Sequence, residues 1–311
     1  MDPNILKNIG QLDHDLNFTK LAEVTDFIKN FDQPKYQQIV DANHLNNLSL
    51  KERQLLVESI AVNVLVRNDH DFNHRLTPPA IGLIFSEIIS LLADEQSVEL
   101  VDFGGGTGSL TFSILANLQN DQINATLIDN NEEFFDFSNE YRPLFSFGNA
   151  TEQVFDDVVS YNFSKKADFL VSDVPVGYYP QTQGLDDFQV KDNDNLTYVQ
   201  NLFIERSIQI LNDNGFAIMA VPQNIFTSEQ SGVLLRMLRE SAYIQGIISL
   251  PLNSFTDHKF VKNIIILQKH GDNAKQITPV LIYQLADIED LKSYQKLFST
   301  LKAWSREIKY I

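Results

Sequence analysis

Cysteine is absent from this chain of 311 residues, which excludes disulfides and any metal site built on thiolate ligands. No apolar run approaches the roughly 20 residues that a membrane-spanning helix needs. The first ten residues lack the basic and apolar regions of a secretory signal peptide. We therefore expect a cytoplasmic protein with no membrane partner.

Positive charge is also scarce, and this bears on the choice of partner. The chain has 24 Lys and Arg against 41 Asp and Glu, a formal net charge of −17. Nucleic-acid binding depends on Lys and Arg that neutralise phosphates, and a DNA-binding domain usually has a basic surface. The charge weakens a DNA substrate without excluding one, because a local basic patch can form in three dimensions.

The histidines give little support for a metal site. His70 and His74 lie four residues apart with no carboxylate ligand assigned beside them, and His258 lies between Asp257 and Lys259 in a segment typical of a loop. A closed metal site needs a fuller ligand set. We expect no bound metal.

Hydrophobic residues make up 43% of the chain, enough for one large domain and a smaller one. Apolar spacing over 18–31 and a capping-box pattern at Ser49 and Glu52 predict a helical N-terminal domain, residues 1–75. It could serve as a lid, a homodimer interface or structural support. We expect a core at 76–270, with residues 271–311 as a tail packed on it.

From Thr77-Pro78-Pro79 onward, helices and strands alternate. Thr77 is a suitable N-cap for a helix that begins at the prolines. The last two predicted strands have no helical segment between them, which predicts an antiparallel pair at one edge of a seven-stranded, mostly parallel sheet. The expected strands are 98–103, 125–129, 144–147, 168–172, 216–221, 243–250 and 261–268.

Residues 98–108, VELVDFGGGTG, predict a buried strand that runs into a glycine-rich turn. Such a turn is a usual binding crevice of an open α/β sheet. Dinucleotide enzymes have the spacing G-x-G-x-x-G, with a third glycine where this chain has Ser109. Here the spacing is G-x-G-x-G, with Asp102 two positions before the first glycine.

Polar residues follow the other predicted strands in the same way. Asp129 lies about 25 residues beyond the glycines, where an acidic side chain can accept the ribose hydroxyls of a nucleotide. Gly148-Asn149-Ala150 follows the predicted third strand and would place an amide beside an adenine ring. The fourth strand leads into residues 172–180, SDVPVGYYP.

With these segments in order, the chain resembles the adenine-specific DNA methyltransferases, above all their type I modification subunits. The resemblance covers residues 77–270 and implies a Rossmann-like α/β methyltransferase fold with S-adenosylmethionine as cofactor. Little chain remains for a target-recognition domain, so it resembles an orphan branch. The implied cofactor-binding residues are Thr77, Pro78, Asp102, Phe103, Gly104, Gly106, Thr107, Gly108, Asp129, Asn130, Asn149 and Ala150.

The resemblance places the family's catalytic Asn/Asp-Pro-Pro-aromatic motif at Asp173, Val174, Pro175 and Val176. It implies that Asp173 and the carbonyl of Val174 accept the two protons of an exocyclic amine. The chain departs from the motif, because Val174 replaces a proline and Val176 replaces the aromatic residue. Losing a base–aromatic stack costs about 1–3 kcal/mol. Tyr178 or Tyr179 is a candidate for the missing ring.

Three functions fit these residues. The leading interpretation is methylation of adenine in DNA. Release-factor glutamine methyltransferases use a similar loop, so methylation of a protein side-chain amide is the first alternative, and an acidic enzyme suits a protein partner. The second alternative is a protein that binds the cofactor without transfer, suggested by Val174 and Val176. Four acids at 186–194, with Lys191 alone among them, fit a solvated loop better than a device to exclude DNA.

Overall fold

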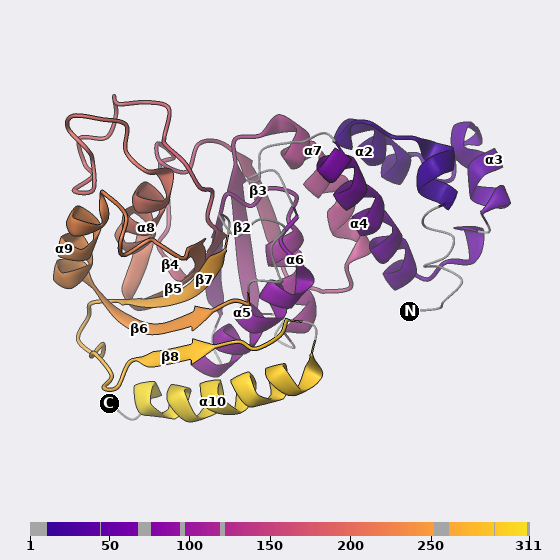
Figure 1. Ribbon diagram of the computed structural model, residues 1–311. Coiled ribbons are helices and arrows are strands. Elements are labelled where there is room, and N and C mark those ends of the chain that lie inside the picture. The colour runs from indigo at the N-terminus through magenta and orange to yellow at the C-terminus, as the bar shows by residue number, and fades with distance from the viewer. Residues whose placement is uncertain are drawn as a thin grey trace.

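The structure is a computed structural model that describes residues 11–43, 45–67, 76–93, 97–118, 122–251, 261–288 and 290–309. Its centre is an eight-stranded sheet with strand order β3-β2-β1-β4-β5-β7-β6-β8, one strand more than the sequence predicts (Figure 1). The strands are β1 (Val98–Phe103), β2 (Ile123–Asp129), β3 (Thr151–Phe155), β4 (Ala167–Asp173), β5 (Leu211–Pro222), β6 (Ala242–Ser249), β7 (Lys262–Lys269) and β8 (Leu281–Gln284).

Within this sheet only β7 runs against the other strands. It pairs antiparallel with both β5 and β6, while the remaining pairs are parallel. The predicted antiparallel pair of β6 and β7 is therefore confirmed. The pair does not form the edge, because β7 inserts between β5 and β6 and β8 adds outside β6.

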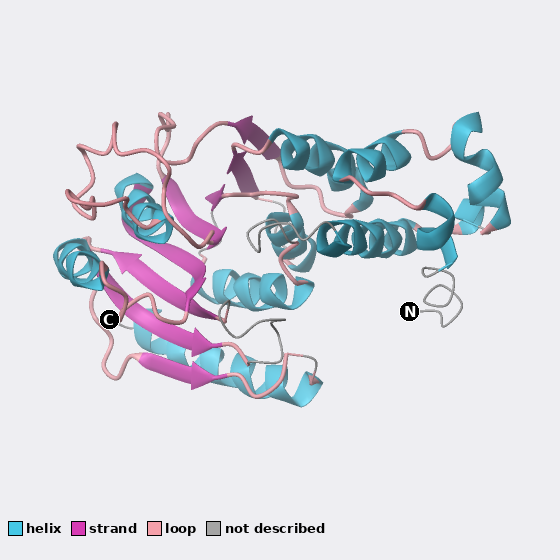
Figure 2. Cartoon of the chain, turned by 45° about the horizontal axis from the view of Figure 1, so that its top comes forward, coloured by secondary structure: helices cyan, strands magenta, loops and turns pink. Residues whose placement is uncertain are grey.

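Helices cover both faces of the sheet, as expected for a mostly parallel sheet. One face is covered by α8 and α9, and the other by α5, α6, α7 and α10 (Figures 1 and 2). Their bounds are α5 (Pro79–Leu92), α6 (Ser109–Asn117), α7 (Glu132–Tyr141), α8 (Val199–Ile210), α9 (Ser231–Ser241) and α10 (Leu291–Lys309).

The N-terminal segment is helical, as the apolar spacing predicts. Residues 11–16 form a helix, followed by α2 (Leu21–Lys29), α3 (Pro34–Ala42), the short 3-10 helix η1 (Leu45–Asn47) and α4 (Leu50–Arg67). The capping box before α4 is confirmed: the Ser49 amide donates to Glu52 Oε2 at 2.8 Å, and the Glu52 amide donates to Ser49 Oγ at 3.3 Å. α2 packs against α7, which joins the helices to the sheet domain.

The predicted third strand at 144–147 is wrong. Residues Arg142–Leu144 form a short 3-10 helix, η3, and the strand begins only at Thr151. Pro143 has no N–H for a ladder hydrogen bond. Phe145 instead packs on Tyr141 and Phe112, with ring centroids 4.9 and 5.3 Å apart. The apolar residues that resembled a strand are therefore part of an aromatic cluster on α6 and α7.

The C-terminal residues extend the sheet and cover it. β8 pairs with β6 along Leu281–Gln284, and α10 packs against α5. Trp304 of α10 is 5% exposed, and its indole N–H donates to the carbonyl of Gln245 on β6 at 3.1 Å. The division of the chain at residues 75 and 270 stays a prediction.

Replacing Trp304 with Ala should lower the free energy of unfolding by about 3–5 kcal/mol, because a buried ring and its hydrogen bond are lost. Urea unfolding followed by circular dichroism measures the change. Leu291→Ala on the same helix is the control: its side chain is 70% exposed, so a change within about 0.5 kcal/mol is expected. Equal effects of the two substitutions would contradict the packing described for α10.

Candidate functional site at the carboxyl edge of the sheet

The strand order places a crevice between β1 and β4. The chain moves outward from β1 to β2 and β3, then returns to add β4 on the other side of β1. In open α/β sheets, ligands bind beyond the carboxyl ends of the strands where the order reverses in this way. The loops after β1 and β4 flank this point, and they are the two loops that the sequence predicts to carry chemistry.

The loop after β1 keeps the backbone open to a ligand. Gly104, Gly106 and Gly108 have φ angles of 66°, 53° and 77°, a region that favours glycine. A Cβ on Gly108 would lie 2.2 Å from the ring of Phe112, so this position tolerates no side chain. The next residue begins α6, whose N-terminus therefore lies directly behind the loop.

Asp102 is buried at the end of β1. Its side chain accepts a hydrogen bond from Thr111 Oγ1 at 2.7 Å, and its other oxygen, Oδ1, has no hydrogen-bond partner among the described residues. The pKa of this carboxyl is raised to about 8, mainly by burial and less by the charges of Asp129 and Asp173, while the hydrogen bond from Thr111 lowers it. An unpaired buried carboxylate oxygen is costly, so it marks a place for a donor or a cation.

Asp129 ends β2 and faces the glycine loop. Its Oδ2 accepts from the amide of Gly106 and its Oδ1 from the amide of Asn131, both at 2.8 Å. These two bonds orient the carboxylate toward the glycine loop. The neighbouring Asn130 is exposed, and Thr107 in the loop is buried.

Asn149 and Ala150 lie at the opposite edge of the sheet from the glycine loop. They precede β3, and Asn149 Nδ2 donates to the carbonyl of Ile123, the first residue of β2. Asp129 ends that strand six residues later, about 20 Å away at ~3.3 Å per residue. The expectation that these two residues follow the third strand is therefore wrong. The acids that do follow β3 are Asp156 and Asp157.

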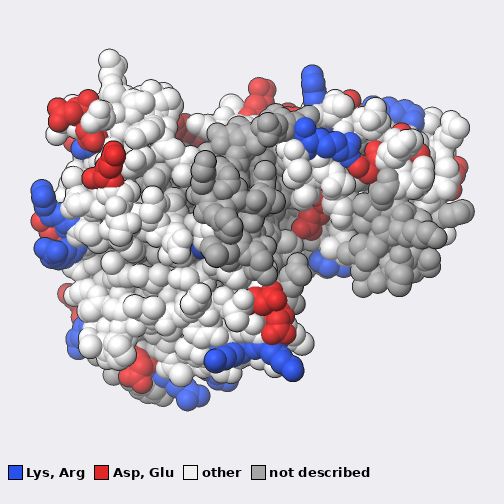
Figure 3. Space-filling model, in the orientation of Figure 1, with Lys and Arg blue, Asp and Glu red and all other residues white. Residues whose placement is uncertain are grey.

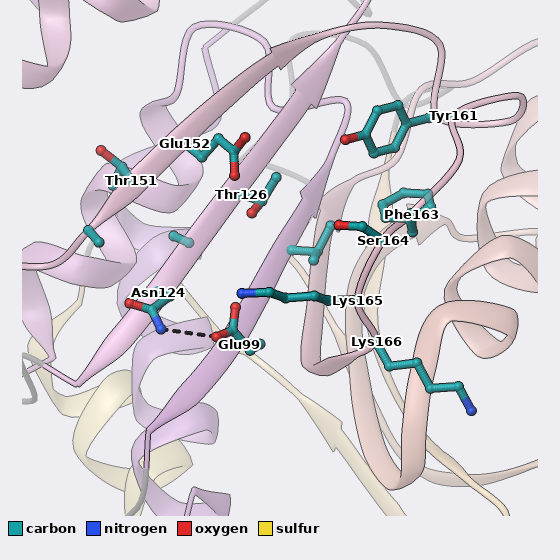
Figure 4. A pocket seen from close by; sticks show the side chains of 13 residues that line it. Glu99, Asn124, Thr126, Thr151, Glu152, Tyr161, Phe163, Ser164, Lys165 and Lys166 are labelled. Atoms are coloured by element: carbon teal, nitrogen blue, oxygen red, sulfur yellow. Dashed lines mark hydrogen bonds between the residues drawn. The ribbon is translucent and has the colours of Figure 1, made fainter.

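Ala150 instead lines a pocket of about 280 Å³ over the amino-terminal part of β2 and β3 and the neighbouring residues Glu99 and Val101 of β1 (Figure 4). Residues 161–166 form its other wall, with the Lys165 side chain reaching across toward Glu99. Glu99 also accepts a hydrogen bond from Asn124 at 3.0 Å. This pocket is separate from the carboxyl ends of the strands and contains none of the other predicted site residues.

Asp173 ends β4 and is bound by two side chains. Thr77 Oγ1 donates to its Oδ2 at 2.8 Å, and the backbone N–H of Thr77 donates to Ser109 Oγ at 3.0 Å. Thr77 thus links the glycine-loop helix to Asp173. It is not the N-cap of α5, a position that Pro78 holds without a side-chain cap. Phe103 joins the loops from behind, its carbonyl accepting from Ser172 Oγ at 2.6 Å.

Lys262 is the second partner of Asp173, and the sequence analysis did not identify it. Its Nζ donates to Asp173 Oδ1 at 2.5 Å and to the carbonyl of Val174 at 2.9 Å. The side chain is only 6% exposed. Because β7 runs antiparallel, its first residue lies at the edge where the parallel strands end, opposite Pro222 of β5. The sequence does show a lysine at the start of an apolar strand that is predicted to run antiparallel, but it does not show what this lysine contacts.

The rings near this loop have different surroundings. Tyr179 is buried, and its hydroxyl donates to Asp157 at 2.9 Å, an arrangement that raises the pKa of Tyr179 through burial and this bond. Tyr178 is 52% exposed and stacks on Tyr198, with centroids 4.7 Å apart. Their hydroxyls lie 3.3 Å apart, and this bond raises the pKa of Tyr198 to about 12. Tyr178 therefore offers an accessible ring and Tyr179 does not.

The acidic segment 185–194 is packed against α8. Leu185 and Val190 are each 1% exposed. The buried carboxylate of Glu205 accepts from the amides of Gln189 and Val190 at 2.8 and 2.9 Å. Three acids of the segment, Asp186, Asp187 and Asp194, are exposed, and Asp186 is paired with Lys191, which agrees with the solvated-loop interpretation. Asp192 is half-buried, and Gln230 Nε2 donates to it at 3.0 Å.

Comparison with known proteins defines the class. Residues 146–303, just over half of the chain, match the N-6 DNA methylase family, and the chain belongs to this family. It is also 27% identical to the uncharacterized protein YtxK of Bacillus subtilis over 238 residues, which span 76% of this chain and 72% of that protein.

Solved structures share the fold. A candidate class I S-adenosylmethionine-dependent methyltransferase from Listeria monocytogenes superposes with a TM-score of 0.83 at 20% identity, covering 98% of this chain and all of that one. The methyltransferase subunit of a type I restriction-modification system from Streptococcus thermophilus gives 0.65 at 16% identity, covering 86% of this chain and 61% of that one. The Rossmann-like methyltransferase fold is thereby confirmed.

The family and fold indicate S-adenosylmethionine as the cofactor, and the site suits it. This cofactor carries a sulfonium and an ammonium group, and the carboxylates of Asp129 and Asp173 lie at this edge of the sheet beside the buried carboxyl of Asp102, whose pKa is raised. The orphaned Asp102 Oδ1 and the glycine backbone provide an acceptor and close approach.

Within the described ranges, no cluster of three or more His, Asp or Glu side chains is arranged to hold a metal ion. His70, His74 and His258 lie outside the described residues. In the same ranges no helix is both long and apolar enough to span a bilayer.

The raised pKa of Asp102 gives a testable pH dependence. Between the ordinary value of 3.8 and about 8, the folded chain keeps a proton that the unfolded chain releases, so the free energy of unfolding falls as pH rises. Asp102→Asn should remove this contribution, which is at most about 1.4 kcal/mol per pH unit. Urea unfolding at pH 5, 6, 7 and 8 measures the slope.

Asp186→Asn is the control, because this exposed carboxyl is paired with Lys191, which lowers its pKa. Its slope over pH 5–8 should match that of the wild type. If the free energy of unfolding of Asp102→Asn has the same pH slope as that of the wild type, Asp102 is ionised in the folded protein at neutral pH.

Proposed function

We propose that this protein transfers a methyl group from S-adenosylmethionine to an amine nitrogen held by Asp173 and Val174, with adenine in DNA as the leading acceptor. Membership of the N-6 DNA methylase family supports the acceptor class. The cofactor residues we assign are Thr77, Asp102, the loop 103–108 and Asp129, joined by an acid after β3 in place of Asn149.

One observation carries the proposal. Asp173 Oδ1 and the Val174 carbonyl both accept hydrogen bonds from a single nitrogen atom, Lys262 Nζ, at 2.5 and 2.9 Å. The position of the lysine nitrogen shows that these two oxygens can accept hydrogen bonds from one nitrogen atom at the same time, so they form an acceptor pair for one amine. This is the arrangement that methylation of an exocyclic amine needs, even though Val174 replaces the family's proline.

The chemistry follows from this pair. The lone pair of an aromatic amine is delocalised into its ring, so the nitrogen is a poor nucleophile. Asp173 and the Val174 carbonyl can accept its two N–H groups and favour a tetrahedral nitrogen whose lone pair points at the methyl donor. The bound cofactor supplies a sulfonium methyl for in-line displacement. Holding the nitrogen in line then accounts for much of the rate.

The rigid support of the loop serves the same end. Thr77 fixes Asp173 Oδ2, which leaves Oδ1 directed at the amine. The backbone N–H of Val174 donates to the carbonyl of Ala220 at 3.0 Å, and this bond holds the start of the loop against β5. Tyr178 is our candidate for stacking on a base that has left the duplex.

The surface charge favours a protein amide as the second candidate acceptor. On the face of the molecule drawn in Figure 3, Lys and Arg are interspersed with Asp and Glu around the rim, and the described residues of this face form no continuous basic area. With a net charge of −17, association with a phosphate backbone is opposed at long range. A side-chain amide has the same two N–H groups to offer Asp173 and Val174.

Replacing Asp173 with Ala tests the proposed role. Transfer of labelled methyl should fall by about 10²–10⁴-fold, the range typical of a lost proton acceptor, while affinity for S-adenosylmethionine changes little. Acceptors are adenine-containing single- and double-stranded oligonucleotides and a protein fraction, assayed with excess enzyme. Calorimetric titration with the cofactor is run alongside, with Asp129→Ala as the variant expected to weaken binding.

Asp186→Ala is the matched control, since it removes an exposed carboxylate from the neighbouring loop. Undiminished transfer by Asp173→Ala would reject its role. Transfer to protein alone would replace DNA by the amide acceptor, and absence of cofactor binding to the wild type would reject the proposed function as a whole.

A further inference from the structure

We propose that Lys262 is a built-in occupant of the amine site and must leave Asp173 and Val174 before an acceptor amine can be methylated. The inference rests on the proposed function and adds to it a residue that controls access. It follows from the position of one side chain, which no motif of the sequence indicates.

The two nitrogens compete for the same oxygens. An acceptor amine has two N–H groups for Asp173 Oδ1 and the Val174 carbonyl, and Lys262 Nζ already donates to both. Hydrogen bonds at these lengths leave no space for a second nitrogen on the same lone-pair directions. Lysine and acceptor therefore exclude one another.

Lys262 has the advantage in this competition. Its ammonium forms charge-assisted hydrogen bonds, which are roughly twice as strong as those of a neutral amine. The side chain is also nearly enclosed, at 6% exposure, so leaving Asp173 would strand a charge unless water or another anion receives it. The site is accordingly closed to a neutral amine at rest.

The fold holds the lysine in this place. Asp173 pairs with Ala220 on β5, and two residues further along β5 Pro222 pairs with Lys262 on β7. Strand pairing therefore fixes the backbone on both sides of the contact. The site opens by rotation of the Lys262 side chain, without a movement of the strands. Lys269, at the far end of the same strand, donates in a similar way to the carbonyl of Leu211 at 2.8 Å.

Lys262→Met tests the proposal, because methionine keeps the apolar length of the side chain and removes the ammonium. Methyl transfer to the acceptor used by the wild type should rise by about tenfold or more, equivalent to ~1.4 kcal/mol of lost competition. Lys269→Met is the matched control and should leave transfer unchanged. Asp173→Ala, added to Lys262→Met, should abolish the gain.

A second measurement does not depend on transfer. Lys262→Ala leaves the two acceptor oxygens open, so ethylammonium should bind there and raise the melting temperature of this variant. The wild type and Lys269→Ala should show no such rise at the same concentration. Ethylammonium that stabilises all three proteins equally would overturn the proposal.

The remaining outcomes are also decisive. If Lys262→Met transfers methyl groups no faster than the wild type, or if neither protein transfers any, the inference is overturned. Because cofactor binding and wild-type transfer are measured separately, failure of the proposed function is recognised by loss of either one, whatever Lys262→Met does.

Discussion

The reversal of β7 within an otherwise parallel sheet is the constraint on which the site depends. A parallel strand in that place would put its last residue at the carboxyl edge; the antiparallel strand puts Lys262 there instead. The lysine then reaches back to Asp173 and Val174 of the loop after β4. Strand direction, more than any local motif, therefore determines which side chain meets the loop after β4.

The second feature of this edge is the concentration of negative charge. Asp129 and Asp173 end β2 and β4, and Asp102 is the last residue but one of β1. The repulsion among these three side chains is reduced in three ways. Asp102 is kept protonated by burial, Asp129 is bound by backbone amides, and Asp173 is bound by Thr77 and Lys262. A cationic cofactor complements such a crevice, because it brings positive charge to carboxylates that are already fixed in place.

Much of this could be predicted from the sequence. The strand at 98–103, the glycine turn, the N-terminal helices and the antiparallel β6–β7 pair follow from apolar periodicity and turn residues, which are local signals. The third strand was misplaced because the aromatic cluster around Phe145 has the apolar character of a strand, and Asn149 was assigned to the wrong edge with it. Lys262 was missed because its partners are about 90 residues away in the chain, and no local pattern reports such a contact.

A crystal structure of the protein with S-adenosylhomocysteine tests the central claim most directly. The account predicts the ligand at the glycine loop, between Asp102 and Asp129, with Lys262 Nζ on Asp173 and the Val174 carbonyl. A ligand bound instead in the pocket over the amino-terminal part of β2 and β3, or a Lys262 side chain directed away from Asp173, would contradict it.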